Sequence, residues 1–84
     1  MKPEIDQELR QFCRNVAFLR ERDALSKAQM ARILHVGAGT LSALEQGEIP
    51  PHVSSAVFFH MAAYFHLKVE DLFTDLSKAG PPRG

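Results

Sequence analysis

Few residues of this chain belong to the types that carry catalytic or metal-binding chemistry. They are one cysteine, Cys13, and four histidines, His35, His52, His60 and His66. A zinc site typically joins a His pair at a spacing of about three to five residues to cysteines. His60 and His66 lie six positions apart, on different sides of a helix. No nucleophile stands with a base and an acid. The sequence predicts no metal, no cofactor, no enzymatic activity and a packed Cys13.

The composition is that of one small globular domain. The chain has 84 residues, of which 45% are hydrophobic and 24% charged, which is ordinary for a soluble domain. One cysteine cannot form an internal disulfide, and no apolar run approaches the roughly 20 residues of a membrane span. Residues 1–6 are charged, unlike a signal peptide. These features predict a cytoplasmic protein that does not enter membranes.

The charges are balanced in number but uneven in position. Ten basic and ten acidic residues give a net charge of zero, whereas a dedicated nucleic-acid binder usually carries excess positive charge. No Lys or Arg occurs from residue 33 to residue 67. The early basic residues are Arg10, Arg14, Arg20, Arg22, Lys27 and Arg32. Any polyanion must therefore meet positive charge contributed by the first part of the chain.

Residues 25–47 carry the pattern of two short helices joined by a tight turn. Ser26 precedes an apolar series and Gln29 follows it by three, which is a capping box at a helix start. We expect helices at about residues 27–34 and 38–46, the second with Leu41 and Leu44 inward. The core residues of the first are Met30, Ala31, Ile33 and Leu34. Only about three residues separate the two helices, so residues 26–47 predict a helix-turn-helix.

The rest of the chain completes an all-α domain of five helices, residues 1–78, followed by a flexible tail at 79–84. A long first helix over about residues 3–22 has the apolar stripe Ile5, Leu9, Phe12, Val16 and Leu19. Ser54 or Ser55 caps a fourth helix that ends near His66. Its inward residues are Phe58, Met61, Ala62 and Phe65, and Phe59 is also assigned to the core. A last helix is expected over residues 69–77, with Leu72, Phe73 and Leu76 apolar.

Residues 16–73 resemble the Cro/phage-repressor, or Xre, helix-turn-helix family. The matching segments are Leu19-Arg20, Leu25-Ser26, Ala31, Val36, Thr40-Leu41-Ser42, Leu44-Glu45-Gln46-Gly47 and Val69-Glu70-Asp71-Leu72-Phe73. The resemblance implies a lambda-repressor-like fold and a transcriptional regulator whose second short helix enters the DNA major groove. It also implies an ion pair between Arg20 and Glu45, which ties the first helix to the end of the third.

The chain departs from the family pattern where DNA is read. The family carries Gln, Arg, Ser or Asn at the start of the recognition helix, but here the residues are Gly37, Ala38 and Gly39. Bidentate contacts from Arg to guanine or from Gln to adenine are therefore absent from this helix start. His35 and His66 also occupy two turns where the family usually has Gly in a positive-φ conformation.

Two functions remain open from the sequence. In the first, the small helix start lies very close to double-stranded DNA, with alanine methyls on thymine and polar residues on phosphates. The predicted DNA-contacting residues are Lys27, Ala38, Gly39, Thr40, Ser42, Ala43 and Gln46, with Arg32 a weaker addition. A homodimer would place two such helices about 34 Å apart. In the second, an antitoxin-like or regulatory protein-interaction module keeps the fold without specific DNA readout.

Overall fold

The computed structural model describes residues 7–78, which form four α-helices and one 3₁₀ turn. The elements are α1 (Gln7–Arg22), α2 (Lys27–Leu34), α3 (Ala38–Glu45), α4 (Ala56–Phe65) and η1 (Val69–Phe73). The predicted all-α class is confirmed, and α2 has the predicted bounds. The predictions for residues 3–6 and for the tail at 79–84 lie outside the described residues.

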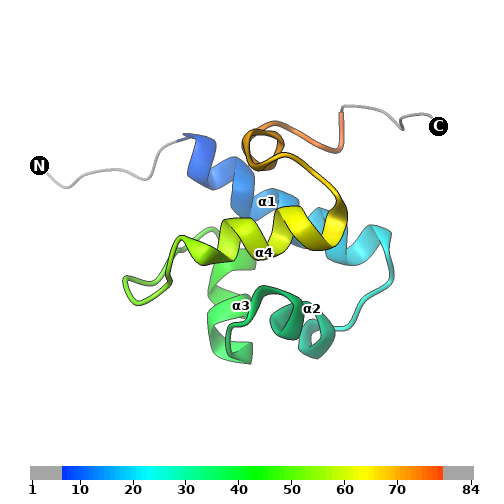
Figure 1. Ribbon diagram of the computed structural model, residues 1–84. Helices are drawn as coiled ribbons and strands as arrows, with labels where there is room; N and C mark the ends of the chain where they lie inside the picture. The colour runs from blue at the N-terminus through cyan, green and yellow to red at the C-terminus, as the bar shows by residue number, and fades with distance from the viewer. Residues whose placement is uncertain (1–6, 79–84) are drawn as a thin grey trace, which may run out of the picture.

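The helices surround one small core, with α4 crossing the middle of the molecule (Figure 1). In this view α2 and α3 lie below α4, while η1 lies above it. α2 packs against both α3 and α4, and α1 packs against α3 and η1. Leu19 and Leu44 are both buried in the shared core. The first and third helices therefore meet, as the predicted Arg20–Glu45 pair requires.

α4 is apolar on almost every side, and its sequence pattern does not define which face is buried. Val57, Met61 and Ala62 are the buried residues of the helix. The ring of Phe58 packs edge-on against Phe12, with 4.8 Å between ring centroids. Phe59 is 60% exposed, so its assignment to the core was wrong. The residues of a helix with continuous apolar character cannot all face inward.

The start of α4 distinguishes between the two predicted capping serines. The Ser54 hydroxyl accepts a hydrogen bond of 2.9 Å from the backbone N–H of Ala56, the first residue of the helix. Ser55 has a helical φ and ψ and makes no side-chain cap bond. Ser54 is therefore the serine that satisfies a backbone donor at this helix start.

The predicted last helix at residues 69–77 was wrong in type and length. It is a 3₁₀ turn that ends at Phe73, and Thr74 is extended, with φ −111° and ψ 161°. Asn15 of α1 explains the early end, because its side-chain Nδ2 donates to the carbonyl oxygens of Leu72 and Thr74 at 2.7 Å each. Carbonyl oxygens that bind a side chain of another helix are directed away from the backbone N–H groups with which they would pair in a continuing helix.

Asn15 is the buried polar residue of the described core, with 1% of its surface exposed. Besides the two bonds that it donates, its Oδ1 accepts from Gln11 Nε2 at 3.1 Å and from the backbone N–H of Leu76 at 3.4 Å. The amide thus uses both its donor and its acceptor capacity, as a buried amide must to offset its desolvation. We call this set of bonds the Asn15 clamp, and it fastens the segment after α4 to α1.

Candidate nucleic-acid interface

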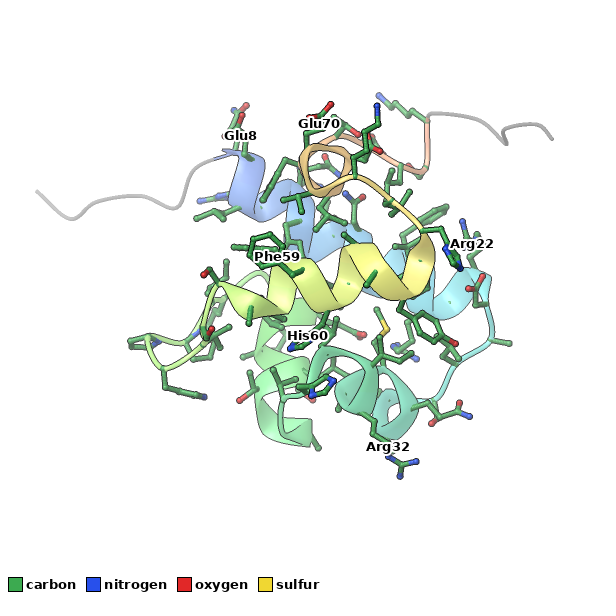
Figure 2. The ribbon with its side chains drawn as sticks, viewed as in Figure 1. Glu8, Arg22, Arg32, Phe59, His60 and Glu70 are labelled. Atoms are coloured by element: carbon green, nitrogen blue, oxygen red, sulfur yellow. The ribbon has the colours of Figure 1, made fainter. Side chains whose placement is uncertain are left out.

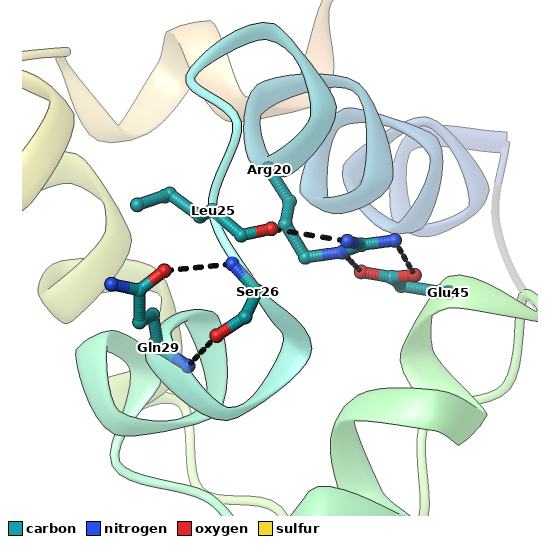
Figure 3. Close-up of polar contacts among 5 residues, drawn as sticks. All are labelled: Arg20, Leu25, Ser26, Gln29 and Glu45. Atoms are coloured by element: carbon teal, nitrogen blue, oxygen red, sulfur yellow. Dashed lines mark hydrogen bonds and ion pairs between the residues drawn. The ribbon is translucent and has the colours of Figure 1, made fainter.

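The helix-turn-helix begins with the predicted capping box at α2. The Ser26 hydroxyl accepts from the backbone N–H of Gln29 at 3.0 Å, and the Gln29 side chain accepts from the backbone N–H of Ser26 at 2.8 Å (Figure 3). The reciprocal pair satisfies two backbone N–H groups that have no helical partner. The start of α2, and with it Lys27, is therefore fixed by a four-residue local motif.

The turn between α2 and α3 is made by a residue in the left-handed conformation. His35 has φ +61°, and the next N–H, that of Val36, donates to the carbonyl of Ala31 at 2.9 Å. His66 ends α4 in the same way, with φ +58°. Both positions are those where the family resemblance places a positive-φ glycine. Ala24, with φ +56°, is a third such residue that the sequence analysis did not identify.

A stacked pair of imidazoles holds this turn against α4. The rings of His35 and His60 are nearly parallel, with 3.9 Å between their centroids and 14° between their planes. Figure 2 shows His60 directed from α4 toward the α2–α3 side of the molecule. The sequence suggested no contact between these two residues, which lie 25 positions apart, one in the α2–α3 turn and the other in α4. Two of the four histidines therefore have a packing role.

α3 begins with small residues that no internal contact requires. Gly37 precedes the helix with φ −77°, a value open to any residue, and it forms no side-chain cap. A Cβ atom placed on Gly37 or Gly39 would meet nothing within 4 Å. Ala38 and Gly39 are exposed, while Leu41 and Leu44 are fully buried. The small size of the helix start is thus a property of the outer surface and not of the core.

The structure brings most of the predicted contact residues to the outside of the helix-turn-helix. Lys27, Ala38, Gly39 and Gln46 are exposed. Thr40, Ser42 and Ala43 are half-buried. α3 ends at Glu45, one residue earlier than predicted, so Gln46 follows the helix as its C-terminal cap. Six of the seven residues therefore lie on or directly after one short helix, and the seventh lies at the start of its neighbour.

A residue that the sequence analysis considered only as a metal ligand lies beside Thr40. His52, in the loop between α3 and α4, has its Nε2 3.1 Å from Thr40 Oγ1. The imidazole is exposed. Pro50 and Pro51 precede it and limit the paths of this loop, but the sequence held no signal that would pair these two residues. His52 therefore joins the candidate interface as a residue found from the structure.

The end of α3 is fixed to α1 by the predicted ion pair (Figure 3). Arg20 Nε and Nη2 donate to the two carboxylate oxygens of Glu45 at 2.6 and 3.1 Å, and Nη1 donates to the carbonyl of Leu25 at 3.2 Å. The side chains of Arg20 and Glu45 are only 16% and 11% exposed. The hydrogen bond to Glu45 raises the pKa of Arg20 above its usual value. This two-pronged contact orients α3 relative to the first helix.

A family model described as a helix-turn-helix domain matches residues 8–71. The chain belongs to the Xre/Cro-like helix-turn-helix family. The match includes α1 except its first residue, both helices of the motif, the loop with His52, and α4. Comparisons with curated proteins and with solved structures gave no match. Membership of this helix-turn-helix family makes the exposed side of α3 the candidate interface.

Positive charge in this helix-turn-helix domain lies beside α3 and not on it. Lys27 and Arg32 are exposed in the first and last turns of α2. Figure 2 shows Arg32 pointing away from α4, on the side of the molecule opposite Glu8 and Glu70. Glu45, which is bound to Arg20, is the one charged residue of α3. α2 thus supplies the cations closest in sequence to the candidate interface.

A second group of cations lies near the other end of α3. Arg10 and Arg14 of α1 line a surface hollow of about 300 Å³ together with Gln46. Both arginines are exposed. Of the predicted contact residues, Gln46 is therefore the one that lies beside these arginines. The arginines come from α1 and not from the helix-turn-helix. The uneven charge of the sequence becomes a surface with cations on two sides of α3.

The described residues give less support to a metal site, a reactive cysteine or a membrane-spanning helix. Residues 7–78 contain no group of three or more His, Cys, Asp or Glu side chains placed to hold a metal ion. Cys13 is buried, as predicted, and burial raises the pKa of its thiol to about 11, although Arg14 acts in the opposite direction. Over the same range no helix has both the length and the apolar character needed to cross a bilayer.

Proposed function

We propose that this domain binds double-stranded DNA through α3 and acts as a transcriptional regulator. One observation carries the proposal: the helix start is small and exposed although neither internal packing nor backbone conformation requires it. Gly39 in a helix costs about 0.5–1 kcal/mol relative to Ala. A surface that must approach the helix backbone closely, such as the floor and walls of a major groove, accounts for that cost.

The proposed contacts divide into weak base readout and phosphate binding. Ala38 and Ala43 would place methyl groups against thymine, which discriminates less than a bidentate hydrogen bond. Lys27, Thr40 and Gln46 would bind phosphates, with Ser42 and Arg32 at the margin. With so few cations near α3, binding is expected to be weak, salt-sensitive and poor in base discrimination. Two copies on half-sites about 34 Å apart would raise the overall affinity.

The test is the salt dependence of binding to a fluorescently labelled duplex of mixed sequence. Replacing Lys27 with Ala should weaken binding evenly across sequences and reduce the slope of log K against log salt by about 1. The matched control is Lys68→Ala, since Lys68 is also exposed but directly precedes η1, and η1 lies across α4 from α2 and α3 (Figure 1). It should leave the slope unchanged.

Two results would contradict the proposal in opposite directions. Absence of binding at about 50 mM salt would exclude the DNA function, because phosphate contacts are strongest at low ionic strength. Tight binding to one sequence that persists at high salt would exclude the weak readout that Ala38 and Gly39 imply. Sedimentation of the protein–duplex complex would give the number of copies bound, and a single copy would argue against the dimer.

A protein-interaction module is the second candidate, and the uncharged surface of α3 favours it. Gly39→Arg separates the two functions, because Gly39 is exposed and a Cβ atom added there meets no neighbouring atom within 4 Å, so the core is left intact. If α3 faces DNA, the added charge should steepen the salt dependence of non-specific binding, even though its bulk opposes the close approach that Gly39 allows. If α3 packs against a protein, the same change should abolish that complex. Gel shift and pull-down on this one variant would distinguish them.

A further inference from the structure

His52 occupies a distinctive position at the candidate interface. Its Nε2 lies 3.1 Å from Thr40 Oγ1, and Thr40 belongs to the first turn of α3. The bond joins the α3–α4 loop to the helix that the proposed function places in the groove. Both partners are accessible, because His52 is exposed and Thr40 is half-buried. A ligand that approaches the start of α3 therefore meets a titratable ring as well as a hydroxyl group.

The protonation state of His52 decides which hydrogens this pair offers to a ligand. A neutral imidazole has one N–H and a protonated imidazole has two. When Nδ1 carries the single proton, the Thr40 hydroxyl has to donate to Nε2. Once the ring is protonated, Nε2–H donates to Thr40 Oγ1, and the hydroxyl hydrogen is released. Protonation thus leaves two outward donors, Thr40 O–H and His52 Nδ1–H, together with a positive charge.

The elements around His52 carry few other charged groups. α3 has one charged residue, Glu45, which is bound to Arg20 at the far end of the helix. The loop contributes one acid, the exposed Glu48. The nearby titratable groups of the α2–α3 turn and of α4 are His35 and His60, which stack on each other. Since no Lys or Arg occurs from residue 33 to 67, any cation in this part of the chain is a histidine, and His52 is the histidine that a hydrogen bond joins to a side chain of α3.

We propose that His52 and Thr40 together form a phosphate-binding pair, and that protonation of His52 strengthens DNA binding. The inference rests on the proposed DNA function and adds a residue and a pH dependence to it. A bound phosphate favours the charged form of the imidazole. Affinity should therefore rise about five- to tenfold between pH 8.0 and pH 5.5, the range over which histidine side chains change charge. The protonated ring should also steepen the salt slope by about 0.9.

The experiment measures the affinity for a labelled mixed-sequence duplex between pH 5.5 and pH 8.0 at constant low ionic strength. It compares the unmodified protein with His52→Gln, which keeps an N–H donor near Thr40 but cannot titrate. The matched control is His66→Asn, because His66 is also exposed, lies at the end of α4, and has a left-handed conformation that Asn tolerates. Thermal melts of the variants verify that each is folded.

We expect His52→Gln to bind at pH 8.0 like the unmodified protein and to lose the gain at low pH, whereas His66→Asn retains it. A full pH dependence in His52→Gln would overturn the inference while leaving the DNA function intact. Absence of binding at every pH would overturn both. NMR titration of the imidazole nitrogens gives an independent result: the pKa of His52 should rise when duplex DNA is added, and an unchanged value would also overturn the assignment.

Discussion

Replacing Asn15 with Leu should destabilise the domain strongly, although the two side chains are similar in size. Leucine matches the shape of asparagine but leaves the carbonyls of Leu72 and Thr74 without their donor, each of them 2.7 Å from Nδ2 in the native structure. An unsatisfied buried acceptor costs about 1–3 kcal/mol. Because Leu72 O is buried and Thr74 O only partly so, we expect a loss of about 3 kcal/mol in the free energy of unfolding.

A loss of this size is measurable by urea and thermal unfolding followed by circular dichroism. At about 4–8 °C per kcal/mol for a domain of this length, Tm should fall by about 12–24 °C. The matched control is Gln11→Ala, which removes the 3.1 Å bond to Asn15 Oδ1 at a part-buried position and an exposed 3.3 Å bond from Arg14, and which should cost about 0.5 kcal/mol. If Asn15→Leu cost no more than the control, the clamp would not fasten the C-terminal segment.

Asn15→Asp examines the same clamp by its pH dependence. A carboxylate cannot donate to the two carbonyl oxygens, so the folded state should favour the protonated acid and raise the pKa above the unfolded value of about 3.9. A raised pKa gives stability that is present at low pH and lost as the pH rises through the folded pKa. Relative to the unmodified protein at each pH, this variant should therefore be less destabilised at pH 4 than at pH 7. An equal loss at both values would contradict the proposed donor role.

Three further predictions concern the ion pair, the helix start and the cysteine. Glu45→Ala should cost about 2–3 kcal/mol, between the values for surface and buried pairs, and a double-mutant cycle with Arg20→Ala should show coupling; additive losses would contradict it. Gly39→Ala should raise stability by about 0.5–1 kcal/mol in thermal melts and weaken DNA binding; unchanged affinity would exclude close approach of the α3 backbone. Cys13 should resist alkylation at pH 8 until the protein unfolds, because burial raises its pKa from the ordinary 9.0 to about 11. The stability that this raised pKa contributes is present below pH 9 and falls as the pH rises toward 11. Rapid labelling of the native protein would refute the burial argument.

Predictions from the sequence succeeded where the determinants are local or follow from the family resemblance. Ser26 and Gln29 lie three positions apart, so their capping box could be recognised from residue types alone. The left-handed turn at His35 and the Arg20–Glu45 pair followed from the resemblance, and the structure has both. In these cases the physical cause, a cap, a turn or a matched charge pair, is specified by residues at fixed positions in a recurring pattern.

The failures come from contacts between distant residues that no pattern encodes. The last helix was predicted too long because its apolar spacing is helical, but Asn15 binds two of its carbonyls from 57 and 59 positions away. Phe59 was assigned to the core because helical spacing places most of the group Phe58, Phe59 and Phe65 inside, but α4 is apolar throughout and its hydrophobicity did not define an outer face. The contact of His52 with Thr40 depends on how the loop returns after Pro50 and Pro51, which propensities do not determine.

The Asn15 clamp also has a consequence for the order in which the chain can fold during synthesis. The acceptor carbonyl of Leu72 is translated 57 residues after Asn15. At about 5–20 residues per second, Asn15 is synthesised about 3–11 s before this acceptor. Over that interval α1, α2 and α3 can meet through the Arg20–Glu45 pair, which spans only 25 residues. The nascent domain should therefore gain its helix-turn-helix half first and close its core last.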